Sequence, residues 1–182
     1  MKNTATAAVI LAVLITALLA PHGCAKIRGM IQRERKDVRR DARVGHPAPL
    51  FTLRDLEGGE VALRDFRGKK FVFLSFWATW CASCREEMPV LDRIHEKFGR
   101  KGLVVLGVNV QESEKKVKSF IKKLGVKYPI LLDGDGKVAN LSYHLYGIPA
   151  NFIINREGVI IYEGASIPEN HERYFERLLE EE

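Results

Sequence analysis

The sequence predicts an α/β fold in which helices flank a mixed central β-sheet, and two observations support this fold class. Short apolar runs bounded by Gly, Pro or charged residues alternate with segments of helical periodicity over residues 44–182. Two of these runs, 71–76 and 103–110, are largely apolar, which is typical of strands buried on both faces. Residues 44–182 are therefore predicted to form one domain with a single core.

The elements follow in order from residue 50. Alternating apolar and polar residues on either side of the turn 57–59 predict a β-hairpin. After the strand 71–76 comes a helix, and after the strand 103–110 Ser113 can cap a helix that ends at Leu124, before Gly125. The remaining predicted elements are strands at 129–132, 150–155 and 159–163 and a closing helix at 168–182. Asp133-Gly134-Asp135-Gly136 predicts a tight turn, because His144 stands where a calcium loop needs Glu.

The charge distribution argues against a nucleic-acid-binding surface. The chain has 29 Lys and Arg against 23 Asp and Glu, a net charge of +6. Residues 1–43 hold 9 basic and 3 acidic residues, whereas residues 44–182 hold 20 of each. The predicted domain thus has no basic excess, and we expect no nucleic acid partner. An apolar fraction of 46% with 29% charged residues also excludes a disordered chain and a multi-pass membrane protein.

Residues 1–24 are predicted to be a signal peptide or membrane anchor. No charged residue occurs from Asn3 to Ala25, and the apolar stretch is short for a membrane span of about 30 Å. Gly23-Cys24 resembles the end of a bacterial lipobox, although Pro21 and His22 depart from that pattern. Cys24 is therefore a candidate lipidation site. The alternative is an uncleaved anchor in which Cys24 is one more buried apolar residue.

Residues 25–43 are predicted to be a basic linker. Because the positive charge follows the apolar segment, the positive-inside rule would place the domain in the cytoplasm. We nevertheless expect export, since the segment is short and its cleavage would remove the conflict. The linker arginines can then lie against anionic headgroups, which makes the membrane surface an expected partner. A plain solvated linker is the alternative.

Cys81-Ala82-Ser83-Cys84 carries the predicted chemistry. At the start of a helix this spacing places both sulfurs on one side, close enough for a reversible disulfide. Cys81 is the expected nucleophile because a helix N-terminus stabilises a thiolate, and Cys84 is the expected resolving thiol. The alternatives are two unreactive core thiols or half of a zinc site. The five histidines lack ligand spacing, so we expect no metal and no cofactor besides the Cys81–Cys84 pair.

The segment FWATWCASCREEMP, residues 76–89, resembles the active site of the TlpA/ResA-like thioredoxin family. Three further segments support the resemblance: GHPAPLF at 45–51, LRDFRGK at 63–69 and YGIP at 146–149. The resemblance implies a thioredoxin-like fold with an N-terminal β-hairpin and an insertion after the second buried strand. It also implies an exported, membrane-tethered domain that exchanges thiols with disulfides.

The resemblance also implies roles for single residues. Pro149 matches the family's cis-proline, beside which a substrate strand pairs with the backbone of Ile148. Trp80, Ile148 and Pro149 are the expected substrate-binding residues. Pro89 matches the proline that bends the active-site helix of thioredoxins.

The proton shuttle is predicted to be Glu87. Thioredoxins carry a buried acid six residues before the first cysteine, but Ser75 stands there in this chain. The family carries an active-site glutamate at the position of Glu87, and periodicity places Glu87 on the same apolar stripe as Leu91 and Ile94. Burial there should raise its pKa and suit it to take a proton from Cys84. The alternative is that Glu87 only complements the helix dipole.

The predicted function is that of a membrane-anchored, extracytoplasmic thiol-disulfide oxidoreductase of the cell envelope, on the periplasmic side. Expected partners are disulfide-containing envelope proteins, among them apocytochrome c, and a membrane electron donor that re-reduces the enzyme. The reducing direction rests on family resemblance alone. A peroxiredoxin-like peroxidase is one alternative, although Leu74 and Ala78 replace its Pro and Thr. A copper-binding protein with Cys81, Cys84 and His144 as ligands is another.

Overall fold

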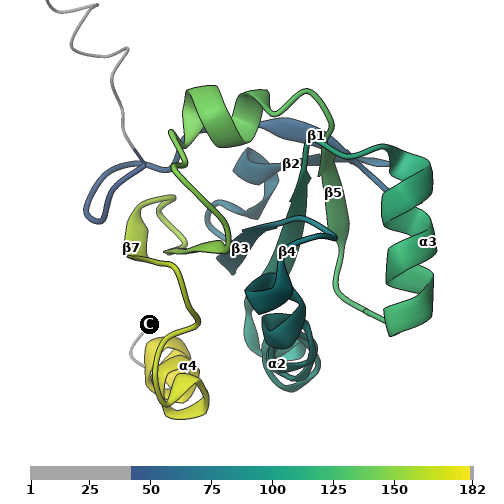
Figure 1. Cartoon of the computed structure of the whole chain (residues 1–182). Helices are drawn as coiled ribbons and strands as arrows, with labels where there is room; N and C mark the ends of the chain where they lie inside the picture. Colours follow the sequence, from purple (N-terminus) through teal and green to yellow (C-terminus); the bar gives the residue numbers. More distant parts are fainter. Residues whose placement is uncertain (1–41, 181–182) are drawn as a thin grey trace, which may run out of the picture. The chain divides into compact units, whose positions relative to one another are not determined.

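The computed structural model describes residues 42–180, which form a seven-stranded sheet flanked by helices (Figure 1). The predicted signal peptide or anchor, Cys24 and the linker up to residue 41 lie outside the described residues. The strands are β1 (Thr52–Asp55), β2 (Glu60–Ala62), β3 (Phe71–Trp77), β4 (Leu103–Val110), β5 (Ile130–Asp133), β6 (Ala150–Ile154) and β7 (Ile160–Gly164). The helices are α2 (Ala82–Phe98), α3 (Glu114–Leu124) and α4 (His171–Glu180), with the short η1 (Leu63–Phe66), η2 (Gly99–Lys101) and η3 (Val138–Ser142).

The sheet is mixed, as predicted, with the order β2-β1-β5-β4-β3-β6-β7. The central strands β3, β4 and β5 are parallel, whereas β6 and β7 add in antiparallel fashion at one side. The predicted hairpin is present as β1 and β2, and β1 also pairs with β5. The predicted insertion after β4 is thus α3 with β5, which joins the hairpin to the central strands.

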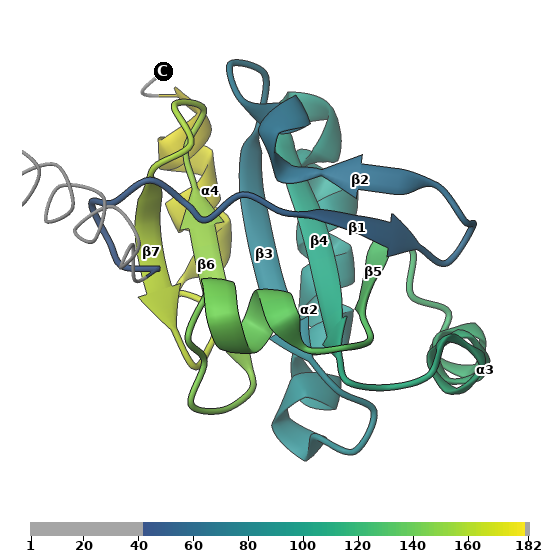
Figure 2. The same ribbon diagram turned by 90° about the horizontal axis from the view of Figure 1, so that it is seen from above.

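Each face of the sheet has its own apolar core, because β3 and β4 bury side chains on both sides. Figure 2 shows the opening segment 44–51 and η3 crossing one face, with α2 and α4 behind the sheet. Phe51, Phe76 and Tyr143 belong to the core on the near face. The other core takes Val117 from α3 and Phe175 from α4. Within residues 42–180 no helix is long and apolar enough to cross a membrane.

Two segments differ from the sequence-based expectation. The closing helix begins at His171 rather than at residue 168, because Asn170 has a φ of 49° and the chain turns before it. The π-helix η3 was not predicted. Its first turn is held by the buried Asp133 carboxylate, which accepts hydrogen bonds from the Val138 and Ala139 amides at 3.1 and 2.8 Å. The Asp-Gly-Asp-Gly segment is therefore a turn that caps η3.

Candidate active site

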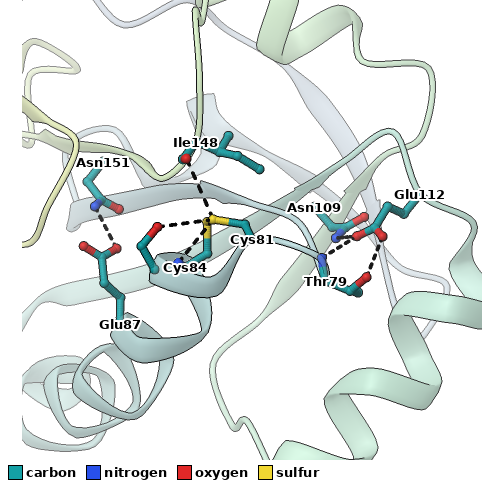
Figure 3. The surroundings of a disulfide bond; sticks show 9 residues. Thr79, Cys81, Cys84, Glu87, Asn109, Glu112, Ile148 and Asn151 are labelled. Carbon is teal, nitrogen blue, oxygen red and sulfur yellow. Dashed lines mark hydrogen bonds between the residues drawn. A yellow bond between two sulfur atoms is a disulfide. The ribbon is translucent and has the colours of Figure 1, made fainter.

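Cys81 and Cys84 form a disulfide at the N-terminus of α2, with a Cα–Cα separation of 5.3 Å (Figure 3). Cys81 is the N-cap residue and comes directly after the loop that leaves β3. Its sulfur accepts a hydrogen bond from the Cys84 amide at 3.2 Å. This amide is one of the unpaired N–H groups of the helix start, so it would face a thiolate in the reduced protein.

The two sulfurs differ in their surroundings. The Cys84 residue is 2% exposed and the Cys81 residue 5%. The Ser83 hydroxyl lies 3.6 Å from the Cys81 sulfur, and the Ile148 carbonyl oxygen lies 3.8 Å from it. The Ile148–Pro149 peptide bond is cis, as predicted. The Cys81 sulfur therefore meets the segment where the family resemblance places substrate, although both cysteines belong to the same apolar core.

Glu87 lies one turn after Cys84, half-buried at the side of α2 that faces β6. Its carboxylate accepts a hydrogen bond from Asn151 Nδ2 at 3.0 Å and another from the Ile167 amide at 3.2 Å. Burial raises the pKa of Glu87, and the two hydrogen bonds oppose that rise without cancelling it. The structure thus gives Glu87 the raised pKa that its apolar stripe predicted.

A second carboxylate, Glu112, lies on the opposite side of the disulfide (Figure 3). It accepts hydrogen bonds from the Thr79 amide and hydroxyl at 2.7 and 2.6 Å and from Asn109 Nδ2 at 2.8 Å. Lys116 forms an ion pair with it at 2.6 Å. Burial alone would raise the pKa of Glu112, but these donors lower it to about 2. Glu112 therefore stays ionised at neutral pH and fixes the loop that leads to Cys81.

The two carboxylates are held in opposite electrostatic environments. Burial disfavours the anion of Glu87, whereas an ammonium group and three other donors favour the anion of Glu112. Pairs of acids whose environments push their pKa values apart identify the one that can exchange a proton. By this criterion Glu87 is the candidate for proton exchange, whereas Glu112 is held as an anion.

Sequence reasoning missed Glu112 and three polar residues that accompany the two carboxylates: Thr79, Asn109 and Asn151. Asn109 and Asn151 had a detectable signal, since each is an amide inside a run that predicts a buried strand. A buried amide needs a partner, so each marks a polar contact from another element.

A groove of about 370 Å³ lies beside the disulfide. Its walls come from the active-site loop, the end of β4, η3 and the segment before β6, with Trp80, Gln111, Tyr146 and Ile148 among the lining residues. Trp80 is 68% exposed, and Tyr146 is fully exposed. The structure therefore brings two of the predicted substrate-binding residues, Trp80 and Ile148, to one groove. Pro149 follows directly in the chain.

The side chains around the disulfide do not form a recognisable metal site. Among the side chains that the structure describes, no three of His, Cys, Asp and Glu come together in a way that could hold a metal ion.

Comparisons with known proteins agree with this geometry. A family model described as the AhpC/TSA family matches residues 44–163. The thiol-disulfide oxidoreductase ResA of Bacillus thuringiensis subsp. konkukian is 32% identical over 168 residues, which cover 91% of this chain and 93% of that protein. ResA of Geobacillus kaustophilus is 38% identical over 137 residues, 74% of this chain and 78% of that protein.

A solved structure gives the same result at the level of the fold. The putative thiol:disulfide interchange protein DsbE of Chlorobium tepidum superposes with a TM-score of 0.68 at 27% identity, covering 78% of this chain and 98% of that one. The fold is therefore thioredoxin-like, as predicted from the active-site segment. With a Cys81–Cys84 disulfide at the start of α2 and relatives of this kind over most of its length, the chain belongs to the AhpC/TSA family as a thiol-disulfide oxidoreductase of ResA type.

Proposed function

We propose that this oxidoreductase is an extracytoplasmic reductase that opens disulfides in envelope proteins. The observation that carries the proposal is the position of the Cys81 sulfur. It accepts a hydrogen bond from the Cys84 amide and lies 3.8 Å from the carbonyl oxygen of Ile148, which lines the groove. An extended client that pairs with the backbone at Ile148 would bring its own disulfide to Cys81.

The reaction proceeds in two exchanges. The Cys81 thiolate attacks one sulfur of the client disulfide, a mixed disulfide forms, and the other client sulfur leaves as a thiolate. Cys84 then gives its proton to Glu87 and attacks the Cys81 sulfur. The Cys81–Cys84 bond forms, the bond to the client breaks, and the second client sulfur leaves as a thiolate. Two electrons have passed from the dithiol to the client, and the enzyme is in the disulfide state seen here.

The assignment of the two cysteines follows from their surroundings. Cys81 receives the helix-start amide, which favours its thiolate, and its sulfur lies 3.8 Å from the carbonyl oxygen of Ile148, a lining residue of the groove. Cys84 lies one turn further along α2 and is 2% exposed, so it is placed to attack the mixed disulfide at Cys81. Glu87 supports the second step because the resolving thiol must lose a proton before it can attack.

The proposed exported location rests on the N-terminal sequence, and the proposed client class rests on the family resemblance of the active-site segment. An uncharged stretch from Asn3 to Ala25 and the Gly23-Cys24 pair support export and tethering. Apocytochrome c is a proposed client, and a membrane electron-transfer protein is the proposed donor that reduces the disulfide again. Mass spectrometry of the purified N-terminus tests this placement. A lipid on Cys24 or a cleaved leader supports the proposed location. An intact Met1, together with a reporter fused to the domain that is active in the cytoplasm, contradicts it.

The equilibrium potential of the Cys81–Cys84 pair tests the reducing direction. It is measured against a dithiothreitol series by thiol alkylation. We expect a value near that of thioredoxin, about −270 mV, whereas a value near that of DsbA, about −120 mV, would assign the opposite direction. Hydroperoxide consumption, assayed in parallel, is expected to be at background.

A further inference from the structure

Asn151 has a buried side-chain amide whose NH₂ group is hydrogen-bonded and whose oxygen is not. It lies on β6, directly opposite Ser75 of β3, and has no exposed surface. Its Nδ2 group donates to Glu87 Oε2 at 3.0 Å, while its Oδ1 atom has no hydrogen-bond partner among the residues that the structure describes. Buried acceptors without a partner are uncommon, so the unpaired Oδ1 of Asn151 beside Glu87 needs an explanation.

Glu87 depends on groups outside its own helix. Its Oε2 atom accepts from Asn151, and its Oε1 atom accepts from the Ile167 amide at 3.2 Å. Cys84 precedes Glu87 by one turn of α2. The phenol of Tyr128 also interacts with Glu87, and its pKa is raised by burial and then by the charges of Asp92 and Glu87. Asn151 therefore supplies the side-chain donor that stabilises the carboxylate.

Proton uptake by Glu87 changes what this pocket needs. The Ile167 amide can only donate, so the arriving proton belongs on Oε2, the oxygen that faces Asn151. There the Glu87 O–H group would face the Nδ2 hydrogens of Asn151, and both groups are hydrogen-bond donors. A half-turn of the amide replaces Nδ2 with Oδ1, which can accept from the new O–H. Asn151 Oδ1 is unpaired while Glu87 is ionised, and it is the atom that can accept a hydrogen bond once Glu87 is protonated.

We propose that Asn151 is a positioning residue for the proton transfer from Cys84 to Glu87, donating to the Glu87 carboxylate and turning over to accept from the Glu87 acid. The inference rests on the proposed resolving step and deepens it. In that step the Cys84 S–H bond breaks and its proton forms the Glu87 O–H. The freed electron pair on the Cys84 sulfur attacks the Cys81 sulfur, and the client thiolate leaves.

The resolving step can be followed with Ellman's reagent as a model disulfide. Reduced protein releases one thionitrobenzoate when Cys81 attacks and a second when Cys84 resolves the mixed disulfide. The rate of the second release is measured by stopped flow from about pH 5 to pH 9. In Asn151→Leu the carboxylate loses its donor, so we expect the second release to slow about tenfold at neutral pH and its half-maximal rate to move to higher pH.

Two further variants separate this role from a structural one. In a Glu87→Gln background, Asn151→Leu is expected to change the second release by less than about twofold, because the group through which Asn151 acts is gone. Asn151→Thr, whose hydroxyl can both donate and accept, is expected to stay within about threefold of wild type. Asn155→Ala, at the β6–β7 turn where Asn155 Oδ1 accepts from the Val159 amide, is the control for lost stability without a change in the pH profile.

Several results of these measurements would overturn the proposed role of Asn151. An unshifted pH profile in Asn151→Leu, or the same slowing in both backgrounds, overturns the positioning role, as does a Thr variant that folds but behaves like Leu. If Glu87→Gln alone matches wild type, the proposed proton acceptor fails and the inference falls with it. If wild type releases a single thionitrobenzoate, the dithiol mechanism itself fails.

Discussion

Replacing Glu112 with Gln perturbs the most strongly held charge beside the disulfide. The Glu112 side chain is 4% exposed. Its Oε2 atom accepts from the Thr79 amide and Asn109, and its Oε1 atom accepts from the Thr79 hydroxyl and Lys116. In the E112Q variant one oxygen becomes an NH₂ group that cannot accept. The best arrangement keeps the oxygen toward the Thr79 amide and Asn109 and leaves the Lys116 ammonium without its partner.

The expected loss follows from the pKa of Glu112. Folding lowers this pKa from 4.5 to about 2. At about 1.4 kcal/mol for each pKa unit, the ionised carboxylate stabilises the fold by up to about 3 kcal/mol at neutral pH. The glutamine side chain retains part of the hydrogen bonding, so we expect E112Q to lose about 2 kcal/mol of unfolding free energy, or roughly 6–8 °C in Tm for a domain of this size.

The direction of the pKa shift determines how the stabilisation by Glu112 depends on pH. Because the folded pKa of Glu112 is depressed, its contribution is complete above the unfolded pKa near 4.5 and is lost as the pH falls toward about 2. The difference in stability between wild type and E112Q should therefore narrow steadily below pH 5. Glu114→Gln, at the exposed neighbouring glutamate of α3, is the matched control and should stay within about 0.5 kcal/mol of wild type.

Urea unfolding of the oxidised protein, followed by circular dichroism at several pH values between 7 and about 3, measures these differences. A loss below about 0.5 kcal/mol at pH 7 would refute the assignment of Glu112 as an electrostatic anchor. A loss that stays constant across the pH range would also contradict it, because it would point to packing rather than to the carboxylate charge.

Three further variants test the exchange chemistry and the packing of the core that contains Phe175 and Tyr128. Cys84→Ser should trap a Cys81 mixed disulfide with oxidised glutathione, seen by mass spectrometry, and rapid loss of the adduct would argue against Cys84 as the resolving thiol. Phe175→Ala removes a fully buried ring that meets Phe73 and Phe98, so it should lose about 4 kcal/mol in urea unfolding, and a loss below about 1 kcal/mol would mean that α4 is not anchored there. Gly107→Ala places a Cβ 2.8 Å from the Tyr128 ring and should lose about 1–3 kcal/mol, whereas an unchanged Tm would show that the ring can move aside.

Most of the fold was predictable from local patterns. The strand 103–110 and the helix that ends at Leu124 have the predicted bounds, because apolar runs and a terminal glycine are signals within a few residues. Ser113 takes the predicted N-cap position, but its side chain makes no capping hydrogen bond. The cysteine pair at the start of α2 was predicted from its C-x-x-C spacing, and the cis bond before Pro149 was implied by the family resemblance. The start of α4 was misplaced because a left-handed Asn170 is not visible in hydrophobic periodicity.

The candidate site was predicted in part, and the missed contacts of Thr79 and Asn151 join residues distant in the sequence. Cys81, Cys84 and Glu87 lie within seven residues of one helix start, so their proximity follows from helical geometry. Thr79 meets Glu112 across 33 residues, and Glu87 meets Asn151 across 64. No local pattern specifies such pairs. They follow from the sheet order, which places the ends of β3, β4 and β6 side by side.

The sequence by itself determined the elements, the redox pair and the balance of charge between the predicted linker and the domain, because each is written in neighbouring residues. Only the tertiary structure showed that two glutamates near the disulfide are held in opposite electrostatic environments. Both are acids near the dithiol, yet Glu112 meets an ammonium group while Glu87 meets a neutral amide. The pKa of a carboxyl depends on burial and on donors within a few ångströms, and here those donors come from strands and loops distant in the chain.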